Sequence, residues 1–299
     1  MTSTEAEAMV PRPARRPTQR RSEIRRTRRR RRVLVALVAL VAVIIGVSVF
    51  VTREDAVADG PSKGRLLFNE SFDGTSLKSD RWSPCYHWSS SGCTNLSNDE
   101  LEWYIPEQVK VADGTLALEA KQQSVTGLDD RRFDYVSGMI SGLSPERPLF
   151  AFKYGYVESR VQVPAGRGLW SAFWMLPTTG ESKPEVDIFE FVGEKPDEVT
   201  MHTHWRQDGK DRQHGYRWQG PDFTEGWHTF GLEWKTDSLT WYVDGAARWK
   251  ITDTEQIPQE DMYLIANLAV GGHFTKSPDD STPFPSSMKV DYIKVWGNQ

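Results

Sequence analysis

The hexapeptide Glu-Val-Asp-Ile-Phe-Glu that starts at Glu185 constrains this chain more than any other segment. Val, Ile and Phe favour a strand, where alternate side chains share a face, so Glu185 and Asp187 point the same way. Glu190 is out of phase, and one bulged residue at Ile188 or Phe189 returns it to that face. The segment therefore predicts a bulged strand with three carboxylates on one face. The alternative is a polar stripe on a solvated strand, where acidic side chains are common.

Three carboxylates on one face have a specific chemical use. Hydrolysis of a glycosidic bond requires two carboxyl groups at one cleft, one as nucleophile and the other as acid/base. The nucleophile has to be ionised and the acid protonated, and neighbouring like charges raise the pKa of one carboxyl group as the acid requires. The hexapeptide is therefore a candidate catalytic segment.

The charge of the chain is divided unevenly. Residues 1–32 contain twelve Arg against three Glu, and the rest of the chain has 25 basic and 38 acidic side chains. Residues 33–51 are nineteen residues without a charge, and a helix of that length is about 28 Å long, close to the hydrocarbon core of a bilayer. The arginines before it favour a cytoplasmic N-terminus rather than a nucleic-acid partner.

These patterns predict a basic cytoplasmic arm over 1–32, a transmembrane signal-anchor helix over 33–51 and a linker over 52–64. The protein would then lie in the cell membrane as a single-pass protein with its large domain outside. The alternative is secretion after cleavage near Ala58, because Ala-Val-Ala at 56–58 resembles a signal-peptide cleavage site.

Residues 65–297 are expected to form one all-β domain. Val157, Ser159, Val161 and Val163 alternate with polar residues, as in a half-buried strand. The Asp-Gly pairs at 113–114 and 244–245 adjoin apolar runs and fit two-residue hairpin turns. Short strands separated by such turns indicate a sandwich or barrel.

Two cysteines, Cys85 and Cys93, are the only ones in the chain. An even count, close spacing and an exported domain favour a disulfide over two buried thiols. No further Cys or His stands at ligand spacing, so no zinc site is expected.

All twelve Trp residues lie in the expected β domain. An exposed indole offers a flat face to a sugar ring, although core packing is the ordinary role of about half of them. The candidates near the acidic segment are Trp170, Trp174 and Trp205. His204 is a further candidate, either bonding a carboxylate or sugar hydroxyl or serving as a structural histidine.

Several segments together resemble glycoside hydrolase family 16, of the laminarinase and lichenase-like type with a bulged Glu-x-Asp-x-x-Glu. Asn98 to Tyr104 is similar to the family's cleft segment, and Gly168 to Trp174 to the strand before the catalytic one. Further similar segments are 67–74, 154–158, 204–205, 227–230, 241–245, 268–272 and 290–292. The resemblance covers roughly 65–297.

The resemblance implies a jelly roll, concanavalin A-like, of two curved antiparallel sheets with the cleft on the concave face. It implies a retaining endo-β-glycosidase on β-linked glucans or galactans, and we expect β-1,3- or mixed β-1,3/1,4-glucan as the substrate. We also expect a monomer that requires no cofactor. By position, Glu185 is similar to the nucleophile, Asp187 to the assisting carboxylate and Glu190 to the acid/base. Asn98 and Trp103 join the aromatic residues and His204 as candidate substrate contacts.

The resemblance also raises the question of a structural calcium ion. Ser71 stands where many members of the family carry Glu, but Glu70 and Asp291 could still supply oxygen ligands.

Other functions remain open on the same fold. A non-catalytic carbohydrate-binding or sensing domain would not need the three carboxylates. A transglycosylase would use the same two glutamates, and a β-galactan hydrolase acting on agar or carrageenan differs in substrate rather than in chemistry.

Overall fold

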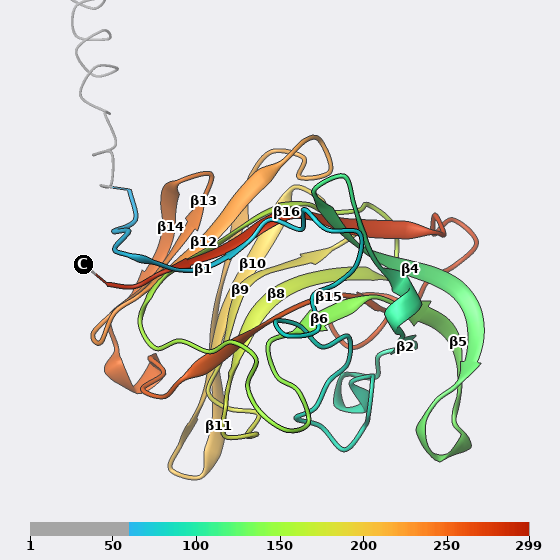
Figure 1. Cartoon of the computed structure of the whole chain (residues 1–299), viewed down its shortest axis with the longest axis horizontal. Helices are drawn as coiled ribbons and strands as arrows, with labels where there is room; N and C mark the ends of the chain where they lie inside the picture. The colour runs from blue at the N-terminus through green and yellow to red at the C-terminus, as the bar shows by residue number, and fades with distance from the viewer. Residues whose placement is uncertain (1–59, 299) are drawn as a thin grey trace, which may run out of the picture. The chain divides into compact units, whose positions relative to one another are not determined.

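The computed structural model describes residues 60–298, which form two stacked β-sheets (Figure 1). The larger sheet has ten strands in the order β14-β13-β12-β7-β16-β4-β5-β2, with β1 also paired to β16 and β3 to β4. The smaller sheet has six strands in the order β11-β10-β9-β8-β15-β6. Neighbouring strands are antiparallel except for β2 and β5, which pair in parallel. The expected two-sheet sandwich is confirmed.

The strands of the larger sheet have these bounds: β1 Leu66–Glu70, β2 Glu102–Tyr104, β3 Val109–Ala112, β4 Thr115–Thr126, β5 Arg132–Ser137, β7 Gly155–Gln162, β12 His228–Trp234, β13 Leu239–Val243, β14 Ala246–Ile251 and β16 Ser286–Trp296. Those of the smaller sheet are β6 Met139–Ser141, β8 Leu169–Pro177, β9 Glu185–Val192, β10 Glu198–Gln207, β11 Lys210–Gln219 and β15 Met262–Val270. Four short 3₁₀ helices complete the described elements: η1 Leu96–Asn98, η2 Pro106–Gln108, η3 Leu128–Asp130 and η4 Thr254–Gln256.

Asp-Gly turns connect three of the hairpins. Asp113 and Asp244, each followed by Gly, stand at the β3–β4 and β13–β14 turns with positive φ at both residues. This backbone conformation is the one that type I′ turns require, and it suits the twist of the two strands. A third pair, starting at Asp208, makes the β10–β11 turn in the same way. The two expected hairpins are therefore confirmed.

The space between the two sheets is filled by apolar side chains from both. Phe173, Phe189, Phe230 and Trp241 are among its fully buried members. A second apolar cluster lies around Tyr104 and includes these residues: Tyr86, Met139, Leu143, Ala172, Trp174, Leu176, Tyr263 and Ile265. On β8, members of the two clusters alternate, so the second cluster covers the other face of the smaller sheet.

The disulfide between Cys85 and Cys93 is present, with the two Cα atoms 4.8 Å apart. It closes part of the long connection between β1 and β2, and Cys93 packs against the second apolar cluster. The bridge therefore fixes a loop that lies beside the cleft described below.

The two ends of the described chain lie side by side (Figure 1). Gly64 donates its N–H to the carbonyl of Gly297 at 3.0 Å, and β1 pairs with β16. The first strand begins at Leu66 and the last ends at Trp296. The expected basic arm, the anchor at 33–51 and most of the linker lie outside the described residues. Within residues 60–298, no helix has the length and apolar character that crossing a bilayer requires.

The two carboxylates considered for calcium are already paired with basic side chains. Glu70 is buried and contacts Lys78 at 2.9 Å and Arg81 at 3.3 Å. Asp291 contacts Arg160 at 2.6 Å. Because Lys and Arg side chains already pair with both carboxylates, these residues do not fit a calcium site. The structure therefore does not support that expectation.

Candidate active site

A β-bulge at Ile188 brings the three carboxylates of β9 onto one face. In the register with β8, Phe173 pairs with Phe189, but the next residue, Trp174, pairs with Asp187. The register with β10 shifts at the same place. Ile188 is thus the extra residue against both neighbours, as the phase of the hexapeptide predicted.

The bulge is stabilised by what it places in the core. Ile188 and Phe189 are both buried between the sheets, together with Val186 and Phe191. Burying each large apolar side chain contributes about 1.5–3 kcal/mol. Without the bulge, strict alternation would point Glu190 into this apolar layer, where an unpaired charge costs several kcal/mol. From the other sheet, Trp241 donates its indole N–H to the Asp187 carbonyl at 2.9 Å and so holds the bulged strand in place.

On the opposite face of β9, the three carboxylates line one cavity of about 330 Å³. Its wall includes these other residues: Tyr86, Trp88, Asn95, Ser97, Asn98, Glu100, Trp170, Ala172, Trp174, Ser182, Lys183, His204, Asp211 and Asn267. A second cavity of about 420 Å³ adjoins it, and Glu190 lines both. Arg217, Phe274 and Lys276 are among the residues around the second cavity.

Two donors hold the Glu190 carboxyl group. His202 Nδ1 lies 2.6 Å from Glu190 Oε2, and Trp170 donates its indole N–H to Oε1 at 3.2 Å. Trp170 also packs against Phe274, with ring centroids 5.2 Å apart. Glu190 is only 7% exposed. Its carboxyl group is therefore fixed in position at the junction of the two cavities.

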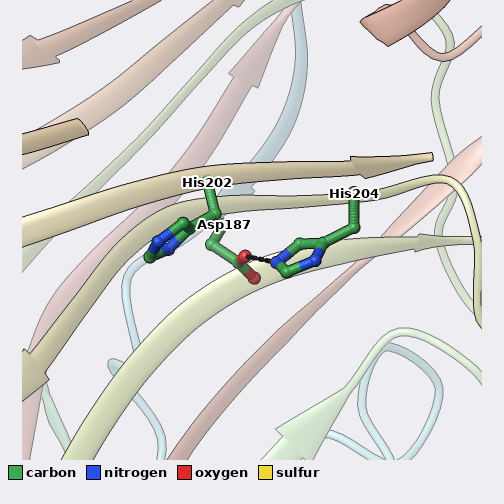
Figure 2. Close-up of side chains that lie close together, drawn as sticks. All are labelled: Asp187, His202 and His204. Carbon is green, nitrogen blue, oxygen red and sulfur yellow. Dashed lines mark ion pairs between the residues drawn. The ribbon is translucent and has the colours of Figure 1, made fainter. Parts of the chain in front are cut away.

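The other two carboxylates share His204. The imidazole Nε2 lies 3.2 Å from Asp187 Oδ2 and 3.6 Å from Glu185 Oε1. Figure 2 shows Asp187 between His204, which it contacts, and His202 on the neighbouring strand. Lys183, just before β9, donates to Glu185 Oε2 at 3.0 Å. Glu185 thus has basic groups on both sides.

The pKa values of these groups shift in ways that follow from burial and charge. Burial and then the Asp187 charge raise the pKa of Glu185, whereas Lys183 and His204 oppose that shift. Burial and the Glu190 charge likewise raise the pKa of Asp187. For the histidines, burial alone would lower the pKa, but the bond of His202 to Glu190 and that of His204 to Asp187 outweigh it and raise both values. The site therefore binds protons more tightly than the isolated groups would.

The structure places the sequence-predicted substrate contacts in two groups. The candidates that line the carboxylate cavity are Asn98, Trp170, Trp174 and His204. Trp103 does not line it, because its ring packs on Phe133 with centroids 5.2 Å apart. Trp205 is also absent from the wall, since it follows His204 on β10 and consecutive strand residues point to opposite faces.

Sequence reasoning missed two basic residues of the site. His202 stands two positions before His204 on β10, so alternation was sufficient to place both rings on one face. Lys183 belongs to the loop before β9, and no pattern in the chain predicts the direction of its side chain.

A second pair of carboxyl groups lies deeper beside the cavity. Glu100 is 5% exposed and accepts hydrogen bonds from Asn98 at 3.0 Å and Tyr104 at 3.5 Å. Glu102 is fully buried and accepts from the Val270 N–H at 2.7 Å. Burial and then the charge of Glu102 raise the pKa of Glu100 well above its ordinary value. Burial also raises the pKa of Glu102.

A further hydrogen-bonded chain supports the wall of the cavity. Trp174 donates its indole N–H to Asn267 at 2.8 Å, and Asn267 donates to the Tyr104 hydroxyl at 3.0 Å. Tyr104 in turn reaches Glu100. This chain connects the smaller sheet to the segment that carries the buried carboxyl pair.

Paired carboxylates in a cavity on the face of a β-sheet that points away from the second sheet define a class of site found in enzymes that cleave glycosidic bonds. Residues 98–294 match the model of the glycosyl hydrolases family 16. The chain belongs to this family.

Curated relatives agree with this assignment. The chain is 35% identical over 235 residues to the endo-1,3-1,4-beta-glycanase EglC of Rhizobium meliloti, with 75% of the chain and 48% of that protein covered. It is 29% identical over 278 residues to a beta-glucanase of Rhodothermus marinus, with 85% and 91% covered. The chain spans about half the length of EglC and of a second Rhizobium meliloti glycanase, ExsH, of which 51% is covered.

Solved structures show the same fold. The catalytic domain of a laminarinase from Thermotoga petrophila superposes with a TM-score of 0.69 at 30% identity, covering 80% of this chain and 99% of that one. An endo-beta-1,3-glucanase from Pyrococcus furiosus also gives 0.69, at 31% identity and with 80% and 96% covered.

Proposed function

We propose that this protein is a retaining endo-β-glucanase that cleaves β-1,3- or mixed β-1,3/1,4-glucan through a covalent glycosyl-enzyme. The observation that carries the proposal is the bulge at Ile188, which brings Glu185, Asp187 and Glu190 to one cavity. Relatives named as endo-1,3-1,4-beta-glycanase and as laminarinase support the substrate class.

The contacts of the site support one division of roles. Glu185 is the nucleophile, and Lys183 and His204 beside it favour the ionised form that attack on the anomeric carbon requires. Glu190 is the acid/base, held by His202 and Trp170 at the junction of the cavities. Asp187 assists by orienting His204, which also lies beside Glu185.

Two adjoining cavities suit an internal cut in a polymer. Because Glu190 lines both, sugars of one chain can occupy each side of the bond that it protonates. Trp170 and Phe274 form an aromatic pair at this junction and offer apolar surface to a sugar ring.

A substrate panel tests the proposal. The purified protein is incubated with laminarin, lichenan, agar, carrageenan and xyloglucan, and the products are identified by mass. Oligosaccharides from laminarin or lichenan are expected at early times, with little free glucose. Release from agar or carrageenan alone would reassign the substrate to galactans. Products longer than an added oligosaccharide would indicate transglycosylation, and binding without any product would indicate a carbohydrate-binding domain.

We also propose that residues 33–51 anchor the protein in the cell membrane with the β domain outside and the arm at 1–32 inside, and that the protein is monomeric. The support for the anchor is the uninterrupted apolar run and the arginines that precede it. Secretion after cleavage near Ala58 remains the alternative, which the fractionation experiment below distinguishes.

A further inference from the structure

We propose that Asp187, His202 and His204 form a binding site for a divalent transition-metal cation, with Zn²⁺ as the probe, and that the bound ion inhibits the enzyme. The binding is argued from geometry, donor chemistry and charge, and it does not depend on the proposed function. The inhibition rests on the proposed function, so the two parts are tested by separate measurements.

The first argument is the geometry of the three side chains. On β10, His202 and His204 share a face, and the register with β9 places His202 opposite Asp187. One ligand atom from each residue lies within 4.8 Å of the other two. Figure 2 shows the carboxylate with an imidazole ring on each side.

The distances are close to those of a coordination sphere. Zinc bonds of about 2.0–2.2 Å to nitrogen and oxygen place tetrahedral ligand atoms roughly 3.4 Å apart. His204 Nε2 and Asp187 Oδ2 are already 3.2 Å apart. The other separations in the cluster are at most 4.8 Å, and rotation of the His202 side chain is the movement expected to close them.

The donor set selects the class of ion. Imidazole nitrogen suits zinc, copper and nickel, whereas calcium and magnesium prefer oxygen ligands. Two histidines and one carboxylate are also a common ligand set of zinc, with a fourth position left for water. Of the six histidines of the chain, the other four each contact a different group: Ser83, Gln256, Asp244 and Asp99.

The charge around the three residues also favours a cation. Glu190 lies 2.6 Å from His202, and Glu185 lies 3.6 Å from His204, so two further carboxylates adjoin the ligand set. Lys183 opposes this attraction, but it is paired with Glu185 at 3.0 Å. The charges of Asp187 and Glu190 remain to stabilise the ion.

Inhibition follows from what the ion displaces. The metal ion would coordinate the Asp187 oxygen that His204 now contacts. It would also compete with Glu190 for His202. The acid/base then loses its shortest contact, and a hydrated cation occupies space in the cavity where a sugar would lie. Sugar and ion are therefore expected to exclude one another.

Calorimetric titration of the full-length protein with ZnCl₂, in a buffer that does not chelate metals, tests the binding. One ion per chain is expected. His202→Gln and His204→Gln should each weaken the affinity by at least about tenfold, in line with the loss of affinity when metal-site residues are replaced. The matched control is His214→Gln, on β11 outside the three-residue cluster, which should bind Zn²⁺ as the wild type does.

Two further measurements keep the test decisive. Zn²⁺ should raise the unfolding temperature of the wild type, because an ion that binds the folded state stabilises it, and each cluster variant should lose that shift. If a variant does not fold, Cu²⁺ bound to the wild type should show two imidazole nitrogens by electron paramagnetic resonance, and Zn²⁺ should displace it.

Absence of saturable binding, or unchanged affinity in His202→Gln and His204→Gln, would overturn the site. If Zn²⁺ binds as expected, hydrolysis of laminarin should fall with the occupancy and recover with EDTA. Binding without any effect on hydrolysis would overturn the inhibition but leave the site. A protein with no activity on any glucan would count against the proposed function, and the calorimetric result would still stand.

Discussion

His202 Nδ1 lies 2.6 Å from Oε2 of Glu190. The two side chains come from neighbouring strands, and the shift in register beside the bulge sets them close together. A hydrogen bond between charged partners is stronger than a neutral one. The contact therefore couples the protonation of a histidine to the residue proposed as the acid/base.

The first prediction concerns this pair and the stability of the fold. Burial lowers the pKa of His202, but the contact with Glu190 raises it above the ordinary value of 6.5. Such a histidine contributes stability that is fully present below pH 6.5 and is lost as pH rises through the folded-state pKa. His202→Gln should therefore reduce the free energy of unfolding by about 1.5–3 kcal/mol in acid and by less in alkali. Urea unfolding near pH 5.5 and near pH 9 measures the difference.

The control for this prediction is His214→Gln, whose native side chain contacts the uncharged Gln256. The stability of both variants is compared at the two pH values. A loss of stability in His202→Gln that is independent of pH would contradict the coupling.

Glu190→Gln tests the acid. Hydrolysis of a natural glucan should fall by roughly 10²–10⁴-fold, because the leaving sugar oxygen needs a proton. An aryl glycoside with an activated leaving group should lose much less. Steady-state rates on both substrates are compared, with Glu119→Gln on the larger sheet as a control that should retain activity. Equal losses on the two substrates would show that Glu190 does not act as the acid.

Glu100→Gln should remove part of the pH dependence of stability. The folded-state pKa of Glu100 lies well above 4.5, so the folded form prefers the protonated acid. Stability is then present below about pH 4.5 and is lost as pH rises through the folded pKa, at up to about 1.4 kcal/mol per pH unit for one proton. The groups that face this acid are Glu102, Asn98, Tyr86 and Tyr104.

A neutral amide has no such charge to desolvate. The free energy of unfolding of the variant should therefore increase relative to that of the wild type as pH rises. Urea unfolding across pH 4 to 8 is the measurement. A constant difference between variant and wild type over that range would mean that Glu100 is ionised in the folded protein.

Removal of residues 1–52 tests the anchor. The truncated chain should be soluble and active, because the site lies wholly within the β domain. The full-length protein should stay with membranes after a high-salt wash, which removes electrostatic attachment but not a spanning helix. Full-length expression that yields a free extracellular protein starting near Asp59 would instead show cleavage.

Much of the site could be predicted from the chain because strand alternation is a strict local rule. The phase of Glu185, Asp187 and Glu190 required a bulge, and Ile188 provides it. The Asp-Gly pairs at 113–114 and 244–245 indicated two hairpins for an equally local reason, since type I′ turns need positive φ. His202 was missed although the same alternation rule places it beside His204.

Other features depend on contacts between distant segments. Trp103 packs on Phe133 through the pairing of β2 with β5, which no local pattern reports. Glu100 and Glu102 look like exposed acidic residues in the chain, but the segment that carries them is buried beside Tyr104 and β15. Lys183 is only two residues from Glu185, but no local pattern predicts the direction of a side chain in the loop before β9.

The central claim is that Glu185 attacks the sugar itself. Two carboxyl groups on one face of a bulged strand are expected about 5 Å apart, too close for a water between them, so the product should retain the β configuration. Proton NMR of the first product released from a β-glucan measures this directly. Initial appearance of the β-anomer is the predicted result, and initial appearance of the α-anomer would contradict the covalent mechanism together with the roles of Glu185 and Glu190.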